Sequence, residues 1–448
     1  MFETVLVANR GEIAVRVIRT CQRLGLKAVA VYSEADAGAL HVRLADDAIL
    51  LGPAPAAQSY LDVDRVLEAA KVSGAQAVHP GYGFLAENAE FARRVAGTGL
   101  VWVGPPPDAI ERMGDKIAAR NTMAAAGVPV APGTEEPVTE VEDAVRAAAG
   151  VGYPLMVKAS AGGGGIGMSV VEDEPSLRAA FETARTRAER FFGSPSILLE
   201  RYVPRARHVE VQVLGLADGR VVALGERDCS VQRRHQKVAE ETPSPGVTPA
   251  LRTRMLDAAV RAAEAVDYRG AGTVECLVPT AGEGAFYFLE MNTRLQVEHP
   301  VTEMVTGVDL VEQQLRVAAG EPPTFDPDDP PQASGHAIEL RVYAEDPRRF
   351  LPGPGTITRW EEPAGEGIRV DAGYAAGDTV TPHYDPLMAK LCAWGTDRAE
   401  ALERLRGAVG GFVVEGPKCN LPFFAELLDH PDFVSGAYDT GLVARMRR

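Results

Sequence analysis

Apolar and polar positions alternate with two different periods along the first hundred residues. Short apolar runs at 3–8, 27–33, 75–80 and 100–104 predict buried strands. Apolar residues three or four apart predict a loop and amphipathic helix at 9–25 and helices at 63–71 and 89–96. Strands that alternate with helices predict a parallel sheet with helices on both faces. The first turn after a strand, Asn9-Arg10-Gly11-Glu12, lacks the GxGxxG pattern, so no dinucleotide site is expected there.

The pattern is more mixed further along the chain. It predicts one long helix at 108–126 that stops at Gly127, a helix at 138–149, and strands at 154–160, 169–173, 196–202 and 208–216. The Pro- and Asp-rich stretch 321–332 predicts a linker. Beyond it the sequence is rich in predicted strands and then becomes helical from Arg398.

A polar side chain stands at every second position between Glu290 and Glu298. On an extended backbone, alternate side chains point to the same side of the strand. This spacing would therefore direct two carboxylates, two amides and a guanidinium into the same cavity. Met291, Leu295 and Val297 would then face the core. The stretch has two interpretations: a site for a metal and an anion, or the polar outer face of a half-exposed strand.

The neighbouring strand bears on this choice. Residues 272–278 and 286–292 are two strand-like runs that bracket a turn containing Pro and Gly, which predicts a hairpin. With the turn centred near Gly282, Glu275 would lie opposite or nearly opposite Glu290. Two facing carboxylates repel each other unless a cation lies between them, and Mg²⁺ or Mn²⁺ suits oxygen ligands and also binds substrate phosphates. The hairpin therefore predicts a nucleotide site nearby.

Several other polar residues are candidates for that site. Lys158 ends a predicted strand and precedes four glycines at 162–165, which are typical of a flap over phosphates, although a plain hairpin turn is the alternative and no Walker A motif is present. Lys116 and His208, taken alone, fit a solvated lysine and a structural histidine. The cationic run 226–243, with Lys237, is either a solvated loop or an anion pocket.

Composition limits the classes of function. With 448 residues the chain is long enough for two or three domains, and 46% apolar and 24% charged residues are typical of globular proteins. A net charge of −16 argues against a protein that binds nucleic acids or anionic membranes in general. The five cysteines are scattered without a CxxC pair, which favours a cytoplasmic protein with reduced thiols. No apolar run is long enough to span a bilayer, and the first residues do not form a signal peptide.

Eight segments together resemble the biotin carboxylases, a family of the ATP-grasp superfamily. They are VANRGEIAVRVIRT (7–20), HPGYGFLAEN (79–88), MGDK (113–116), KASAGGGGIGM (158–168), RHVEVQV (207–213), ERDCSVQRRHQKVAEETP (226–243), FLEMNTRLQVEHPVTE (288–303) and RVYAEDP (341–347). The resemblance implies an α/β and α+β multidomain fold: a doubly wound, Rossmann-like domain at 1–113, an ATP-grasp domain at 114–330 with a mobile lid near 131–204, and a β-rich C-terminal domain at 331–448.

The resemblance also implies a role for each matching residue. It implies Mg²⁺ or Mn²⁺ ligands at Glu275, Glu290 and Asn292, and ATP contacts at Lys116, Lys158, Gly163, Gly164, Gly165, Glu200, Arg201, Val203, His208, Gln232, His235 and Leu277. It implies bicarbonate contacts at Lys237, Arg294, Gln296, Val297 and Glu298, and biotin contacts at Tyr82, Gly83 and Arg341. Glu298 is the expected general base, Arg341 is expected to stabilise the biotin enolate, and Lys237 and Arg294 complete the catalytic set.

The implied activity is the ATP- and bicarbonate-dependent carboxylation of biotin through carboxyphosphate, the first half-reaction of acetyl-CoA or another acyl-CoA carboxylase in fatty acid synthesis. The chain has no Ala-Met-Lys-Met sequence for biotin attachment, so we expect a separate biotin carboxyl carrier protein, separate carboxyltransferase subunits and a homodimer. The alternatives are another ATP-grasp ligase and an inactive nucleotide-binding subunit.

One position departs from the family pattern. Ile166 stands in the glycine-rich segment where the family usually has arginine. The missing cation predicts an active enzyme with a raised KM for ATP.

Overall fold

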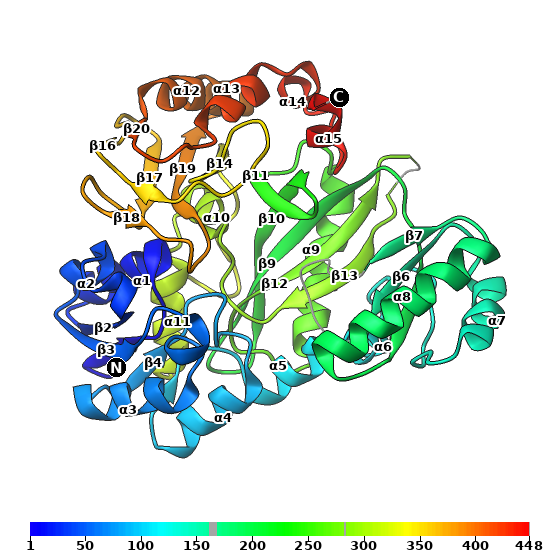
Figure 1. Cartoon of the computed structure of the whole chain (residues 1–448), viewed down its shortest axis with the longest axis horizontal. Helices are drawn as coiled ribbons and strands as arrows, with labels where there is room; N and C mark the ends of the chain where they lie inside the picture. Colours follow the sequence, from blue (N-terminus) through cyan, green and yellow to red (C-terminus); the bar gives the residue numbers. More distant parts are fainter. Residues whose placement is uncertain (161–167, 282–283, 448) are drawn as a thin grey trace.

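The first domain is a parallel sheet between helices, as expected. The computed structural model describes residues 1–160, 168–281 and 284–447. The strands lie in the order β3-β2-β1-β4-β5, and every pair is parallel. Their bounds are β1 Thr4–Val7, β2 Lys27–Ser33, β3 Asp47–Gly52, β4 Ala77–His79 and β5 Val101–Trp102. The sheet forms the core of the N-terminal part of the chain (Figure 1).

Helices surround this sheet. They are α1 Gly11–Arg23, α2 Leu40–Leu44, α3 Val63–Ser73, α4 Ala89–Gly97 and α5 Pro107–Gly114, with short 3₁₀ turns at Glu34–Asp36 and Ala56–Gln58. The sequence prediction missed β3, because its first four residues are exposed or half-buried and include Asp47. An edge strand of this kind has no clear apolar pattern.

The long helix predicted at 108–126 is wrong, since the structure has two helices there. The helix α5 ends at Gly114, and α6 spans Lys116–Ala125. Asp115 between them is extended, and its carboxylate accepts hydrogen bonds from the N–H groups of Ile117 and Ala118. An aspartate that caps the second helix in this way interrupts the first. The break directs Lys116 towards the large cavity described below.

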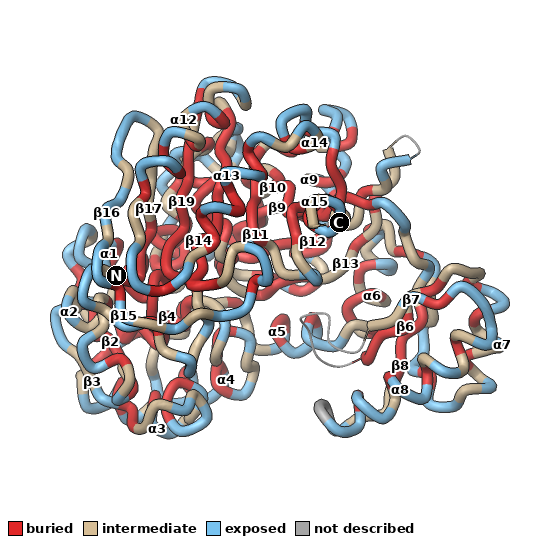
Figure 2. Tube along the Cα trace, turned by 45° about the horizontal axis from the view of Figure 1, so that its top comes forward, coloured by how far each residue is buried: buried red, intermediate tan, exposed pale blue. Residues whose placement is uncertain are grey.

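Residues from the middle of the chain form a small lobe that projects from the rest of the molecule (Figures 1 and 2). Its antiparallel sheet has the order β7-β6-β8, and the helices α7 and α8 pack on it around their own apolar core. The bounds are α7 Val141–Val151, β6 Leu155–Ala159, β7 Ser169–Val171, α8 Glu174–Phe192 and β8 Ile197–Arg201. The predicted strands and helix are present, although α7 begins three residues later than expected.

An antiparallel sheet of eight strands organises the remainder of the molecule. Its order is β13-β12-β9-β10-β11-β14-β19-β17. The strands are β9 Ala206–Gly215, β10 Val221–Arg233, β11 Gln236–Thr242, β12 Gly270–Pro279, β13 Tyr287–Asn292, β14 His336–Tyr343, β17 Ile368–Ala372 and β19 Leu387–Gly395. Because β11 pairs with β14, one sheet continues across the expected domain boundary at 330/331. The predicted linker 321–332 has no helix or strand.

Helices and short strands cover this sheet. The helices are α9 Pro249–Glu264, α10 His299–Thr306, α11 Leu310–Ala318, α12 Arg398–Gly411, α13 Leu421–Asp429, α14 Pro431–Ser435 and α15 Leu442–Met446. The short strands are β15 Gly355–Thr356, β16 Arg359–Glu361, β18 Thr379–Val380 and β20 Val413–Glu415. The expected β-rich segment followed by helix from Arg398 is therefore confirmed. Buried residues concentrate along the strands of the sheet (Figure 2).

In the described parts of the chain, no helix has both the length and the apolar character needed to cross a membrane.

Candidate active site

A cavity of about 2740 Å³ lies where the N-terminal domain, the lobe and the large sheet meet. Most of the predicted site residues line it: Tyr82, Gly83, Lys116, Lys158, Glu200, Val203, His208, Gln232, His235, Lys237, Glu275, Leu277, Glu290, Asn292, Arg294, Gln296, Val297 and Arg341. These residues come from sequence positions more than 250 apart, so only the fold brings them together.

Among the described residues, Arg201 and Glu298 do not line the cavity. Glu298 is fully buried behind it. The Arg201 side chain donates two hydrogen bonds to the Val151 carbonyl oxygen. Gly163, Gly164, Gly165 and Ile166 lie outside the described residues.

The predicted hairpin places Glu275 opposite Glu290. The strands β12 and β13 are antiparallel, and the two glutamates are direct partners in their register. Burial and the neighbouring Glu275 raise the pKa of Glu290, while Lys116 acts against this shift. A bound cation would relieve the repulsion between the two carboxylates.

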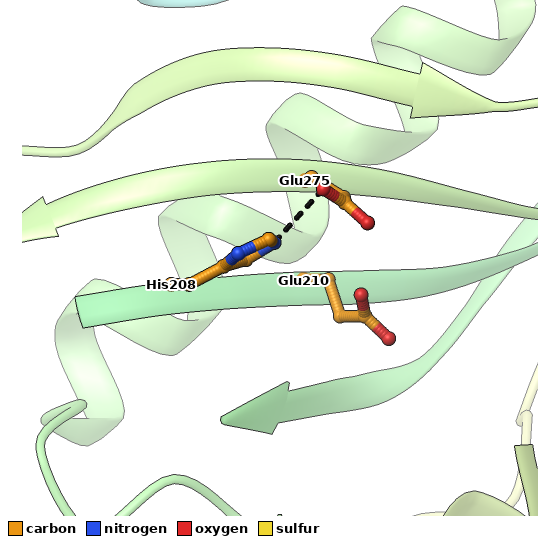
Figure 3. A group of neighbouring side chains, drawn as sticks. All are labelled: His208, Glu210 and Glu275. Atoms are coloured by element: carbon orange, nitrogen blue, oxygen red, sulfur yellow. Dashed lines mark ion pairs between the residues drawn. The ribbon is translucent and has the colours of Figure 1, made fainter. Parts of the chain in front are cut away.

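The strand β9 brings further titratable groups to the same face (Figure 3). His208 and Glu210 project from one side of β9, and Glu275 lies on the adjacent β12. The Nε2 atom of His208 is 2.9 Å from a Glu275 oxygen. The Nζ atom of Lys237 is 2.6 Å from Glu210 and 2.8 Å from Glu275, so these two carboxylates share one ammonium.

The predicted metal ligands Glu275, Glu290 and Asn292 suit a hard cation. Two carboxylates and the amide of Asn292 form an oxygen-rich set, which Mg²⁺ and Mn²⁺ prefer. In this structure the Asn292 amide nitrogen donates to Glu275 and its oxygen accepts from Arg294. Although burial alone would raise the pKa of Glu275, Lys237 and His208 lower it, which keeps the carboxylate ionised for a cation.

The extended stretch predicted from Glu290 to Glu298 is only partly correct. The strand β13 ends at Asn292, and residues 293–298, here called the anion loop, lead into α10 with Glu298 at its N-cap position. The polar residues still gather, because Arg294 donates to the side-chain oxygens of Asn292 and Gln296. Leu295 is buried as expected, whereas Val297 lines the cavity.

Glu298 lies between two cations. One carboxylate oxygen is 2.6 Å from Lys237 Nζ and the other is 2.9 Å from Arg341 Nη2. Burial alone would raise the pKa of Glu298, but Lys237, Arg341 and Arg227 lower it well below its ordinary value. The carboxylate is therefore ionised and, while both cations hold it, a weak proton acceptor.

Arg341 also lines the cavity and pairs with a second carboxylate. Its Nε atom is 2.7 Å from the buried Glu240 on β11. Burial raises the pKa of Glu240 to about 7, although Arg341 opposes the shift. Tyr82 also lines the cavity, and its hydroxyl donates a hydrogen bond to Glu12.

The opposite end of the cavity lies against the lobe. Lys158 on β6 pairs with Glu200 on β8, and both side chains are largely buried. Lys116 is half-buried at this end, which contradicts the solvated position that its sequence context favours. Burial lowers the pKa of Lys116, Glu290 acts against this, and Lys158 adds to it. Two lysines at one end of a cavity are suited to an anionic ligand such as a polyphosphate.

The cationic run 226–243 is a hairpin rather than a solvated loop. It forms most of β10 and β11, with a tight turn at Arg234 and His235, both of which have positive φ. Gln232 is hydrogen-bonded to the His208 ring, which fixes that ring from the neighbouring strand.

The sequence reasoning missed one buried residue of the cluster, Glu210. It is fully buried and accepts a hydrogen bond of 2.6 Å from Nε of Arg227, a buried residue of the cationic run. The alternation of His208, Glu210 and Gln212 in a predicted strand could have identified Glu210, because all three fall on one face.

Comparisons with known proteins give one consistent family. The family models "Biotin carboxylase, N-terminal domain", "Carbamoyl-phosphate synthase L chain, ATP binding domain" and "Biotin carboxylase C-terminal domain" match residues 1–110, 115–324 and 339–445. A biotin carboxylase of Halalkalibacterium halodurans is 54% identical over 99% of this chain and 97% of its own length. Biotin carboxylase 2 of Bacillus subtilis is 53% identical over 98% of each chain.

Solved structures agree with these sequences. The biotin carboxylase of Campylobacter jejuni, crystallised as a β,γ-ATP complex, is 42% identical with a TM-score of 0.96 and 99% coverage of both chains. The biotin carboxylase domain dimer of Hydrogenobacter thermophilus 2-oxoglutarate carboxylase, in complex with MgADP, ADP and bicarbonate, is 44% identical with a TM-score of 0.95, covering 99% of this chain and 98% of that one.

Proposed function

The chain belongs to the biotin carboxylase family and is an ATP-dependent ligase that carboxylates biotin with bicarbonate, and we propose that the large cavity is its active site. One observation carries this proposal: residues from each of the expected ATP, metal, bicarbonate and biotin sets line the same cavity. Sites that exchange an unstable intermediate need this proximity, since carboxyphosphate decomposes in water.

We propose that bicarbonate binds beside the anion loop. Lys237 and Arg294 supply positive charge for its oxygens, and Gln296 adds an amide. Glu298 accepts the bicarbonate proton. In the structure Lys237 and Arg341 hold Glu298 ionised. When Lys237 donates a hydrogen bond to bicarbonate, its interaction with Glu298 weakens. The pKa of Glu298 then rises and the carboxylate becomes a stronger base.

The nucleotide occupies the end of the cavity near the lobe. Lys116 and Lys158 face its phosphates, and Glu200 and Val203 lie where an adenine can be held. Glu275, Glu290 and Asn292 would hold Mg²⁺ or Mn²⁺, which neutralises phosphate charge when bound. The aligned bicarbonate oxygen attacks the γ-phosphorus, giving carboxyphosphate and ADP.

Biotin enters at the end marked by Tyr82 and Gly83. Carboxyphosphate breaks down to CO₂ and phosphate, and that phosphate removes the ureido proton of biotin. Negative charge then develops on the ureido oxygen, and the permanently protonated Arg341 stabilises it. Carbon–nitrogen bond formation to CO₂ gives carboxybiotin.

We also propose the biological setting. Biotin is carried on a separate carrier protein and carboxyltransferase subunits use the product, which is supported by relatives named as separate carboxylase subunits, such as one from the pyruvate carboxylase of Methanothermobacter thermautotrophicus. A homodimer is supported by the dimeric Hydrogenobacter domain.

Unpaired cysteines support a cytoplasmic enzyme. Acetyl-CoA, for fatty acid synthesis, is the proposed final acceptor; relatives named for propionyl-CoA and pyruvate define the competing outcomes.

The test is ATP cleavage by the purified chain with bicarbonate and free biotin varied independently. We expect turnover that needs bicarbonate and increases with biotin. Turnover indifferent to biotin, even at high concentration, would refute the function, while bicarbonate-independent ligation of an amine would indicate another ATP-grasp ligase. An absence of turnover together with nucleotide binding would indicate an inactive subunit.

A further inference from the structure

Two successive carbonyl groups of the anion loop are held by side chains outside the cavity. The Gln296 carbonyl oxygen is 2.8 Å from His299 Nδ1, and the Val297 carbonyl oxygen accepts a hydrogen bond of 3.0 Å from Lys390 Nζ. A carbonyl oxygen only accepts, so Nδ1 of His299 carries the proton. His299 and Lys390 are completely buried, and neither lines the cavity.

The first of these contacts sets the direction of a peptide group. The bond between Gln296 and Val297 is trans, so the Gln296 carbonyl and the Val297 N–H point to opposite sides. Because His299 holds the carbonyl on one side, the N–H is directed to the other, where Val297 borders the cavity. Within the described residues, no hydrogen bond uses the Val297 N–H. This donor is therefore available for a ligand.

The second contact ties the loop to the N-terminal domain. Lys390, on β19, lies 3.0 Å from a carboxylate oxygen of Glu12 at the start of α1. Glu12 in turn accepts from the Tyr82 hydroxyl at the predicted biotin end. Burial would lower the pKa of Lys390, but Glu12 and Asp371 raise it, so the lysine stays charged. A charged buried lysine with a carboxylate partner is a rigid support for the Val297 carbonyl.

We propose that His299 and Lys390 are positioning residues that aim the Val297 N–H at bicarbonate. The inference rests on the proposed function, since it assigns bicarbonate to this loop. Neither residue touches the reacting atoms. Each acts through the backbone of the anion loop. Their loss therefore weakens bicarbonate binding more than ATP binding.

A matched pair of variants at His299 tests this role. In His299→Asn the side-chain amide stands near the position of Nδ1 and can still donate to the Gln296 carbonyl, whereas in His299→Gln it stands near Nε2, which has no partner in the described structure. We expect His299→Gln to raise the bicarbonate KM about tenfold, the effect of losing roughly one buried hydrogen bond. His299→Asn should stay within about threefold of the parent, and the ATP KM should change little in both.

Lys390→Met gives a second test, with Asp371→Asn as its control. Asp371 is 3.8 Å from Lys390 in the same buried cluster. Asp371→Asn removes one charge from that cluster but leaves the hydrogen bond from Lys390 to the Val297 carbonyl oxygen. Only Lys390→Met should raise the bicarbonate KM, although both variants should lower the melting temperature. If His299→Gln does not fold, this pair decides the question.

Direct bicarbonate binding, measured by calorimetry with MgADP present, tests the positioning role separately from the proposed function. Weaker binding in His299→Gln and Lys390→Met than in their controls supports the positioning role. Equal bicarbonate affinity in all variants overturns it, even when the parent enzyme is active. A parent chain that binds bicarbonate but never cleaves ATP contradicts the proposed function alone.

Discussion

Replacing Lys237 with methionine should destabilise the protein in a way that depends on pH. The ammonium lies 2.6, 2.8 and 2.6 Å from Glu210, Glu275 and Glu298, and its side chain is only 11% exposed. Removing one partner of a buried ion pair costs about 3–5 kcal/mol. Each carboxylate keeps a second cationic neighbour, namely Arg227, His208 or Arg341, so we expect about 3 kcal/mol, at the lower end of that range.

This loss can be read as a change in melting temperature. At about 2–4 °C per kcal/mol for a unit of 150–250 residues, it corresponds to roughly 6–12 °C near pH 7.5. Lys237 lowers the pKa values of Glu275 and Glu298, and stability from a lowered carboxylate pKa is lost as pH falls through the folded-state value. In the variant these carboxylates bind protons more readily, so the difference from the parent should shrink as pH falls from 7.5 to about 3, chiefly below the ordinary glutamate pKa of 4.5.

The assay is differential scanning calorimetry of both proteins across this pH range. Lys418→Met is the control, because that lysine is 70% exposed and its pair with Asp346 should contribute little. A difference between parent and Lys237→Met that stays constant or widens at low pH would refute the assignment of Lys237 as the shared counter-ion. Bicarbonate-dependent ATP cleavage should also be lost in the variant.

Three further substitutions test individual roles. Arg341→Ala should lower biotin carboxylation at least tenfold more than bicarbonate-dependent ATP cleavage, because the ureido charge loses its cation; equal losses would remove Arg341 from that role. Glu298→Gln should depress both activities by about 10²-fold or more in steady-state assays, and retained ATP cleavage would point to another base. Ile166→Arg should lower the KM for ATP about threefold or more, because it restores the cation that the family usually has at this position, and an unchanged KM would show that the position needs none.

Much of the fold follows from local patterns. The strands β1, β2 and β4 and the helices α1, α3 and α4 were predicted because their apolar residues repeat with a clear period. The division at Asp115 was not predicted, since an aspartate within a helical pattern becomes a cap only when the chain turns there. The anion loop was predicted as a strand for a related reason: alternating polar residues are compatible with either structure until packing selects one.

The candidate site shows the same limits. Glu275 and Glu290 could be paired from the sequence, because a short turn fixes the register of a hairpin. Glu298 was identified as a site residue, but its burial behind Lys237 and Arg341 was not foreseeable. Those contacts join β11, β14 and the N-terminus of α10, and no local rule relates such distant segments.

The sequence by itself therefore determined which residues can carry the chemistry, because side-chain type and short spacing are local properties. Its motifs also indicated the family. Only the tertiary structure decided how the charges are shared, since one ammonium, that of Lys237, serves carboxylates on two strands and a helix N-terminus. It also placed His299 and Lys390 behind the anion loop. Electrostatic interactions depend on distance in space and on burial, and neither is encoded at any single position of the chain.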